Sequence, residues 1–297
     1  MQTRHSDYTS PGDASLSGPT VTPYPFADGD LARRLERTEA NAAARFVEAR
    51  ARVFPQSGAG WMEFAGAFAL YDGVDSPVRQ TFGLGMFDPV TPGVLDEIER
   101  YFTARGAPVL HEVCPLAGVA LAALLHERGY LPVEFTSVMY RPIHVDTGHT
   151  QTHGGSGVTV RVIGPAEADV WAQTSAGGWG EMPGASGFLR DIGAINAARE
   201  DAVCFLAELG GEPIAAAALC VSPGEGVAQM AGACTLPGAR RRGAQLALLA
   251  ARMRHGAARG CDVAMIGAEP GSASQRNAER HGFRVAYTRV KWQLTHA

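Results

Sequence analysis

The chain has 297 residues, of which 46% are hydrophobic and 19% are charged, and its formal net charge is −4. This balance is typical of one or two globular domains with real hydrophobic cores, and the weak negative charge argues against a nucleic-acid partner. The cysteines are odd in number and none forms a Cys-x-x-Cys pair. We therefore expect reduced thiols and neither a disulfide framework nor a zinc site.

The N-terminal segment, residues 1–22, is polar and rich in Ser, Thr, Gly and Pro. It lacks the apolar stretch of a secretory signal, and the longest apolar run, Ile214 to Val221, is too short to span a bilayer. We therefore expect a disordered tail at 1–22, no membrane partner and a cytoplasmic location. A homodimer is one assembly that the sequence allows.

A second polar stretch, residues 144–157, contains histidines at irregular spacing with no acidic or cysteine partner nearby. A solvated interdomain linker explains this composition better than a metal site does. The linker separates an expected first domain at 23–143 from an expected second domain at 158–297.

The ends of the two halves resemble each other. Three pairs of segments correspond in the same order and at a nearly constant offset: 104–109 and 258–263, 127–130 and 280–283, and 135–140 and 287–292. A chance match would not keep both order and offset, so the sequence predicts two copies of one fold.

Periodicity and turn residues predict the elements of the second half. We expect strands at 158–163, 202–209, 213–221, 226–235, 263–268 and 287–294, and helices at 165–174, 187–199, 242–259 and 272–281. This order predicts a mixed α/β fold with a strand–loop–helix unit near its centre.

The strand–loop–helix unit is the part of the sequence that indicates chemistry. After the strand ends at Thr235, Pro237 and Gly238 break regular structure, and arginines at 240–242 and then Gly243 precede the helix. Backbone N–H groups at a helix start lack partners and carry the positive end of the dipole, which favours phosphate. A lone arginine run is usually solvated surface, but the flanking strand, glycine and helix favour a phosphate site here. The pattern is neither a Walker loop nor a Rossmann fingerprint.

The stretch Thr235-Leu236-Pro237-Gly238-Ala239-Arg240-Arg241-Arg242-Gly243-Ala244-Gln245 resembles the pyrophosphate loop of GNAT N-acetyltransferases. In that family a strand is followed by Val-x-Pro-x-x-(Arg/Gln)-x-x-Gly-x-(Gly/Ala) and a helix. The Pro, the Arg and the first Gly fall in register, whereas Gln245 departs from the last position. A strand, a helix and the pair Gly282-Phe283 follow in the family's order, and the resemblance covers roughly residues 158–297.

The resemblance implies an α/β protein of two GNAT-like domains, each a mixed, mainly antiparallel sheet flanked by helices, with acetyl-CoA as cosubstrate and no metal. The residues that would hold the cofactor are Ala233, Cys234, Thr235, Arg240, Arg241, Arg242, Gly243, Ala244, Gln245, Leu246, Ser274 and Asn277. An open strand edge would pair with the pantetheine arm, as an added strand does. The implied reaction is direct acyl transfer to the amine of a small molecule or a protein.

Many GNAT enzymes have an acidic Tyr four residues before the Gly of the Gly-Phe pair, and Ala278 stands there in this chain. The proton donor is then Tyr287, Ser274, Cys234 or water, and the general base is Glu181 or Glu269.

The first half lacks the phosphate loop. Residues 87–97, at the corresponding place, contain acidic side chains and no arginine, and such a loop would repel a pyrophosphate. We expect a degenerate GNAT-like domain that packs on the second one and lines its substrate cleft. His111, Glu112 and Cys114 on a predicted buried strand are better explained as a strand end than as a catalytic trio.

Three classes of function remain open from the sequence. The first is an N-acetyltransferase. The second is a non-catalytic acyl-CoA-binding or regulatory protein with a GNAT fold, which Ala278 favours. The third is an interaction protein that keeps only the fold.

Overall fold

The computed structural model describes residues 23–143, 157–180, 186–222 and 224–295. In these residues the strands are β1 (Gly60–Phe64), β2 (Ala67–Tyr71), β3 (Thr81–Phe82), β4 (Leu110–Val113), β5 (Tyr130–Pro142), β6 (Val158–Val162), β7 (Ala202–Leu209), β8 (Glu212–Ser222), β9 (Val227–Thr235), β10 (Val263–Ala268) and β11 (Arg284–Leu294). The α-helices are α1 (Gly29–Val53), α2 (Pro92–Thr103), α3 (Val119–Glu127), α4 (Ala168–Trp179), α5 (Ser186–Ala197), α6 (Ala244–Ala258) and α7 (Ala273–Arg280). The expected tail at 1–22, nearly all of the expected linker and Glu181 lie outside the described residues.

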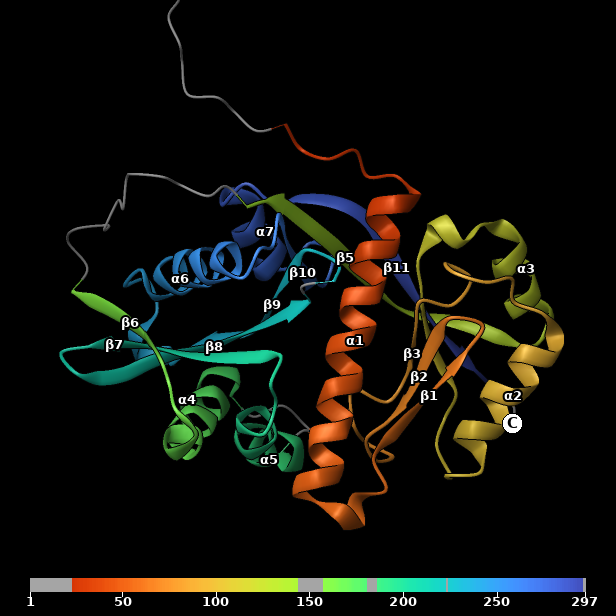
Figure 1. Cartoon of the computed structure of the whole chain (residues 1–297), viewed down its shortest axis with the longest axis horizontal. Coiled ribbons are helices and arrows are strands. Elements are labelled where there is room, and N and C mark those ends of the chain that lie inside the picture. Colours follow the sequence, from red (N-terminus) through yellow and green to blue (C-terminus); the bar gives the residue numbers. More distant parts are fainter. Residues whose placement is uncertain (1–22, 144–156, 181–185, 223, 296–297) are drawn as a thin grey trace, which may run out of the picture.

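All of these strands form one sheet in the order β1-β2-β3-β4-β11-β5-β10-β9-β8-β7-β6 (Figure 1). Neighbouring strands are antiparallel, except that β3 is parallel to β4 and β9 is parallel to β10. The expectation of a mixed, mainly antiparallel sheet flanked by helices is confirmed.

The second half repeats the order of the first. The series β1-β2-β3-α2-β4-α3-β5 corresponds to β7-β8-β9-α6-β10-α7-β11, and the two parallel pairs occupy equivalent places in it. This correspondence supports two copies of one fold, as the repeated segments predict.

The two copies do not form separate sheets, because their last strands are exchanged. Strand β5 of the first half pairs with β10 of the second half, and β11 of the second half pairs with β4 of the first. The exchanged strands β5 and β11 also pair with each other, from Arg284 opposite Tyr140 to Leu294 opposite Tyr130. The ranges 23–143 and 158–297 therefore remain our proposal for the limits of two copies that share one sheet.

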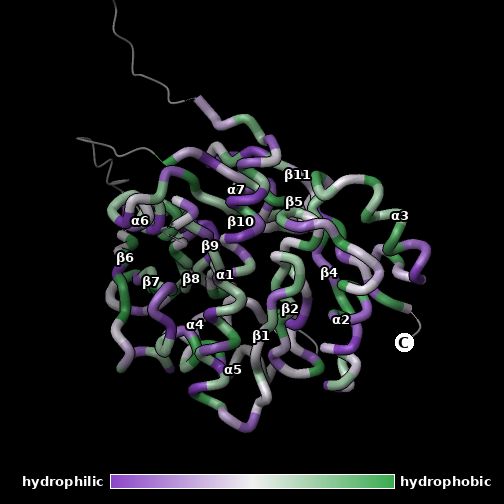
Figure 2. Tube along the Cα trace, turned by 45° about the vertical axis from the view of Figure 1, so that its right-hand side comes forward, coloured by the Kyte–Doolittle hydropathy of each residue, from purple (hydrophilic) through white to green (hydrophobic). Residues whose placement is uncertain are grey.

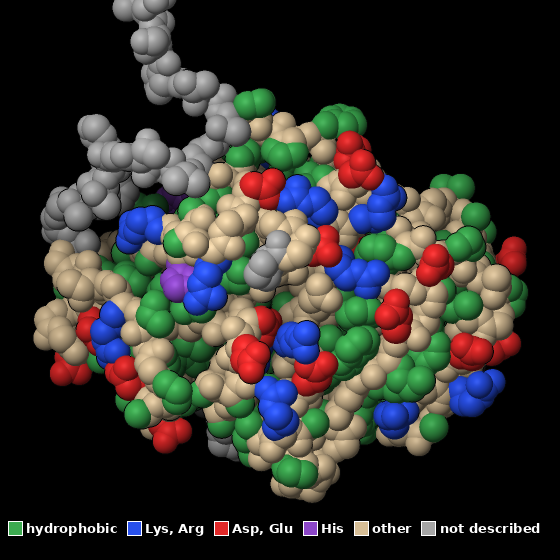
Figure 3. Space-filling model, in the orientation of Figure 1, with side chains coloured by type: hydrophobic (Ala, Val, Ile, Leu, Met, Phe, Trp, Pro, Cys, Tyr) green, Lys and Arg blue, Asp and Glu red, His purple; other side chains and the backbone are tan. Residues whose placement is uncertain are grey.

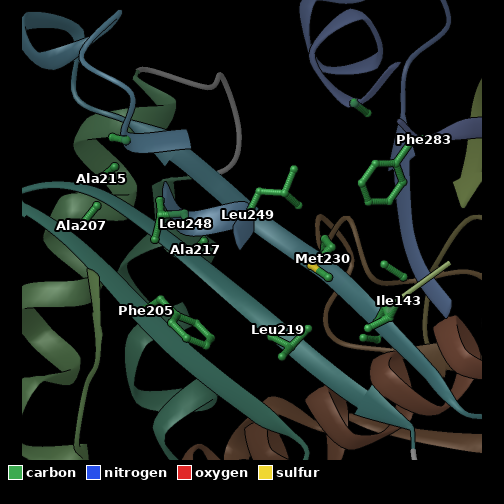
Figure 4. Close-up of a cluster of buried hydrophobic side chains, with 14 of the residues drawn as sticks. Ile143, Phe205, Ala207, Ala215, Ala217, Leu219, Met230, Leu248, Leu249 and Phe283 are labelled. Atoms are coloured by element: carbon green, nitrogen blue, oxygen red, sulfur yellow. The ribbon is translucent and has the colours of Figure 1, made fainter. Parts of the chain in front are cut away.

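The helices cover both faces of the sheet. Alternate residues of β2 belong to different cores: Ala67 and Ala69 pack with α2 and α3, whereas Phe68 and Leu70 pack with α1. On the second half, α6 and α7 cover the face of α2 and α3, and α4 covers the other face. Figure 4 shows the core below α6, where Leu248 and Leu249 lie over the sheet.

Helix α1 joins the two halves. Asp28 caps its start by accepting the N–H groups of Asp30 and Leu31, which stabilises a helix N-terminus. Hydrophilic and hydrophobic residues alternate along it (Figure 2), as expected of a helix with one buried face. Its contacts reach β1, β2 and β3 of the first half and β8 and β9 of the second, so α1 lies across the face that both halves build.

None of the helices in the described ranges is long and apolar enough to cross a membrane. The cysteines Cys114, Cys204, Cys220, Cys234 and Cys261 are all free and buried.

Candidate functional site

Strands β9 and β10 start as a parallel pair and then separate. Val263, Ala264 and Met265 lie opposite Val227, Ala228 and Gln229. Beyond this point β9 continues to Thr235 and β10 to Ala268 without pairing to each other. The edge of β9 that follows Gln229 is thus free of a strand partner within the described sheet, and an extended ligand can pair with it.

A β-bulge lies on this open part of β9. Cys234 is opposite Ala216 and Ala231 is opposite Ala218, so Gly232 and its successor face a single residue of β8. Gly232 has φ 57°, a left-handed conformation that glycine adopts without a steric penalty. A bulge interrupts the ladder and changes the direction of the backbone groups, here next to the opening between the strands.

The loop after β9 presents unpaired backbone N–H groups. Pro237–Ala239 is a single 3₁₀ turn, and Arg241 and Gly243 both have left-handed backbones, with φ 65° and 82°. The first amide of α6 with a backbone acceptor is that of Ala247, which donates to Gly243 O over 3.0 Å. The amides of residues 241–246 have no backbone acceptor in the described chain, which is the condition for binding a phosphate at a helix start.

Charged and polar side chains surround these amides. Arg240, Arg241 and Arg242 are all exposed, so their charges lie in solvent beside the helix start. Gln245 instead turns inward, and its Nε2 donates to Thr235 Oγ1 over 2.8 Å. The residue that departs from the family pattern therefore ties the first turn of α6 to the end of β9.

Helix α7 follows β10 next to the open strands. Ser272 caps it by accepting the N–H of Gln275 over 3.1 Å, while Ser274 is exposed and Asn277 is half-buried. Ala278 belongs to the hydrophobic core below α6. Ser274 and Asn277 stay predictions as contacts of the cofactor.

The catalytic candidates lie in different places. Tyr287 is buried and its hydroxyl donates to Glu36 Oε1 over 2.7 Å. Burial raises the pKa of Tyr287 well above its ordinary value, so this phenol is a poorer acid than a solvated one. Glu269 is exposed just beyond β10, and Glu181 lies outside the described residues. Their catalytic roles stay predictions.

Cys234 is enclosed rather than presented to a ligand. Its Sγ lies 3.5 Å from Ser175 O and 3.8 Å from Thr174 O, and burial raises the pKa of the thiol. A thiol with a raised pKa is a weak nucleophile, because the thiolate is the reactive form.

We therefore expect the Cys234→Ala protein to keep kcat/KM within a few-fold of the wild type when CoA thiol release is measured. Cys261→Ala is the matched control for loss of a buried thiol from the same half. A covalent nucleophile would behave differently, since its removal lowers kcat by orders of magnitude, and such a loss in Cys234→Ala alone would refute direct transfer.

A cavity adjoins the open strand edge on the face that carries α1. Its volume is about 1060 Å³. The second half contributes Trp171, Trp179, Ile192, Asn196, Arg199, Ala218, Cys220, Gln229, Ala231 and Gly232, and the first half contributes Glu39, Ala42, Ala43, Phe46, Val74, Asp75, Pro77, Val78, Arg79, Gln80, Phe82 and Pro108. Because Gln229, Ala231 and Gly232 belong to β9, the cavity leads to the place where β9 and β10 separate. Both halves line it, which the sequence suggested only in general terms.

In the first half, the chain around β3 packs closely on neighbouring side chains. A Cβ atom at Gly66 or Gly83 would collide with Phe87, and one at Gly85 would collide with Leu121. The start of α2 is capped, because Thr91 Oγ1 accepts the N–H of Val94 over 3.3 Å. The Thr91 cap satisfies one amide at the start of α2, which adds to the acidic charge that the sequence shows at 87–97.

The polar residues of β4 are part of the interior. His111 is fully buried, its Nε2 lies 3.1 Å from Tyr130 Oη, and burial lowers the pKa of His111 to about 3. Glu112 and Cys114 are buried as well. This arrangement agrees with a strand end in a core and leaves His111 neutral at physiological pH.

A buried charge network connects α1 to β11. Arg289 is fully buried, and its Nη2 lies 2.9 Å from Glu36 Oε1 and 2.8 Å from Glu39 Oε2. Burial raises the pKa of Glu36, although the charge of Arg289 acts in the opposite direction. The hydroxyl of Tyr287 completes the network at Glu36. The network thus holds the first half's long helix on the last strand of the second half.

Comparison with known proteins agrees with this geometry. Residues 159–270 match the model of an acetyltransferase (GNAT) domain, whereas a comparison with curated proteins found no match. A GCN5-related N-acetyltransferase from Kribbella flavida superposes with a TM-score of 0.57 at 20% identity, covering 86% of this chain and 96% of that one. A GCN5-related N-acetyltransferase from Sphaerobacter thermophilus gives a TM-score of 0.51 at 16% identity, covering 91% and 93%.

A tandem GNAT protein from the clavulanic acid biosynthesis pathway gives a TM-score of 0.54 at 13% identity, covering 92% of this chain and 98% of that one. At such identities the solved structures establish the fold alone. The family match is confined to residues 159–270, which resemble a GNAT acetyltransferase domain, and the chain as a whole has a fold similar to that of a tandem GNAT protein.

Proposed function

We propose that the protein is an N-acetyltransferase that moves an acetyl group from acetyl-CoA directly to an amine. The strongest support is that three features adjoin one another: the unpaired amides, the open edge of β9 and the cavity. Unpaired amides at the start of α6 lie next to the open edge of β9, and that edge forms part of a cavity large enough for an acceptor.

The cofactor would extend along this path. Its pyrophosphate would accept hydrogen bonds from the amides of residues 241–246, with Arg240 and Arg242 adding positive charge. Its pantetheine arm would pair with Ala233, Cys234 and Thr235 of β9. The thioester would then lie near Gly232, at the entrance to the cavity.

The reaction requires a neutral amine. The amine nitrogen forms a bond to the thioester carbonyl carbon, the carbon–sulfur bond breaks, and a base removes one proton from the nitrogen while the thiolate leaves. Backbone N–H groups near the β9 bulge are suited to polarise the carbonyl. Ala278 stands in place of the family's tyrosine, so another group or water protonates the thiolate. A thiolate can leave without a strong proton donor more readily than an alkoxide can.

Since deprotonating the amine is the harder step, we expect Glu181→Gln to lower kcat/KM more than Tyr287→Phe does. Neither change should alter acetyl-CoA affinity. General base catalysis typically contributes about 10²- to 10⁴-fold, so the effect is measurable in a thiol-release assay between about pH 6 and pH 9. Equal activity of the wild type and Glu181→Gln across that range would exclude Glu181 and leave Glu269 or water as the base.

The function is tested by following CoA thiol release with a panel of amines. Amine-dependent release together with the acetylated product supports the transferase. Binding of acetyl-CoA without release for any amine would favour a non-catalytic acyl-CoA-binding protein, which Ala278 also allows. Absence of acetyl-CoA binding would leave a protein that keeps only the fold for interactions.

A further inference from the structure

Arg79 is a cation in the wall of the cavity, and its guanidinium has no ion-pair partner among the described residues. It lies in the connection from β2 to β3, two residues before β3 begins, and it lines the cavity. Its Nε is buried without a hydrogen-bond partner. Among the residues that the structure describes, no carboxylate forms an ion pair with its guanidinium. Burial lowers the pKa of Arg79, which shows that the charge is partly removed from water without full compensation.

The other charges of the cavity wall are already compensated or solvated. Arg199 Nη2 lies 2.6 Å from Asp201 Oδ2 and donates to Ala42 O over 3.0 Å. Glu39 is held by Arg289 at 2.8 Å. Asp75 is exposed, and its charge favours the charged form of Arg79 without an ion pair between them. Figure 3 shows the face that carries α1, with acidic and basic side chains side by side over its middle.

We propose that the acceptor is an amine that also carries an anionic group, and that Arg79 binds this group. The inference rests on the proposed function, because it places the acceptor in the cavity. A guanidinium binds carboxylate or phosphate through two parallel hydrogen bonds, which would satisfy the uncompensated charge of Arg79. The anion therefore binds on the first half, while the amine points to the second half.

The remaining walls fit such a molecule. The nucleophilic nitrogen has to reach the thioester near Gly232 of β9, whereas Arg79 belongs to the other half of the cavity wall. Phe46, Phe82 and Trp171 also line the cavity and suit an apolar body between the two polar ends. The substrate class is thus an amino acid or a related amine that carries a carboxylate or a phosphate.

The test uses matched acceptors and the full-length protein. Thiol release is measured with L-phenylalanine and L-phenylalaninamide, with L-leucine and L-leucinamide, and with O-phosphoethanolamine and ethanolamine. The first two pairs test a carboxylate and the third tests a phosphate. For the acidic members that are turned over, Arg79→Gln should lower kcat/KM roughly 10- to 100-fold, as loss of a hydrogen-bonded charge predicts.

Controls separate this inference from the proposed function. Arg79→Lys should recover part of the loss, the neutral members should be unaffected by Arg79→Gln, and Arg100→Gln on the exposed surface of α2 should change nothing. The inference is overturned if neutral members are better acceptors than their acidic pairs, if Arg79→Gln lowers both members equally, or if no acidic member is turned over although acetyl-CoA binds. Loss of acetyl-CoA binding in the wild type would instead refute the proposed function.

Discussion

The Gly243→Val protein is expected to lose acetyl-CoA binding, with an affinity at least about 100-fold below the wild type. Gly243 precedes α6 with φ 82°, and a β-branched residue is strongly disfavoured in that region. Valine would force the turn into another conformation and move the amides of residues 241–246 away from a common ligand. Each lost hydrogen bond to a charged group costs about 1.5–3 kcal/mol, so losing two already accounts for this change.

Isothermal titration calorimetry with acetyl-CoA measures the effect. The matched control is Gly211→Val, because Gly211 has φ 87° in the β7–β8 hairpin. Valine there causes a similar backbone strain at a place outside the proposed acetyl-CoA site. Circular dichroism establishes that both variants are folded. A folded Gly243→Val protein with wild-type affinity would refute the location of the pyrophosphate.

Arg289→Met is expected to lower the free energy of unfolding by about 3–5 kcal/mol, the usual cost of removing one partner from a buried ion pair. Arg289 is 1% exposed and lies between Glu36 and Glu39. Without it, Glu36 stays in the interior with only the hydroxyl of Tyr287 as a partner. Urea unfolding at constant pH measures the difference.

The same variant should depend on pH in a defined direction. Burial raises the folded-state pKa of Glu36, and Arg289 is the main charge that opposes this rise, so Arg289→Met raises that pKa further. When a carboxyl has a higher pKa in the folded than in the unfolded state, the folded protein loses stability as the pH rises through the folded-state pKa. The deficit of Arg289→Met should therefore shrink as the pH falls from about 8 towards 5.

The double variant Glu36→Gln/Arg289→Met removes the titrating group and is the control for this effect. It should recover part of the lost stability and lose most of the added pH dependence. A deficit in Arg289→Met below about 1 kcal/mol, or one that is the same at both ends of the pH range, would contradict the role given to the network.

Much of the second half could be predicted because its signals are local. Strands β7 and β10 begin and end at the residues predicted from periodicity and turn residues, and a helix follows the loop that contains Gly243, as predicted. The helix predicted at 272–281 is observed as α7, with Ser272 as its cap. In each case a few neighbouring residues determine the conformation.

The features that could not be predicted are non-local. The exchange of β5 and β11 could not be predicted from the repeated sequence segments. Such a repeat indicates two copies of a fold but does not indicate which strands pair. Tyr287 was a candidate acid on sequence grounds, and only the packing of α1 over β11 shows that its hydroxyl meets Glu36. Arg79 was missed because its significance depends on a cavity whose walls come from both halves.

We expect one acetyl-CoA to bind at the opening between β9 and β10, and none to bind at the equivalent position of the first half. Calorimetric titration of the protein with acetyl-CoA measures this stoichiometry. Saturable binding with one site per chain is expected for the wild type and for Gly211→Val, and no binding is expected for Gly243→Val. Absence of binding to the wild type, or two sites per chain, would contradict this expectation.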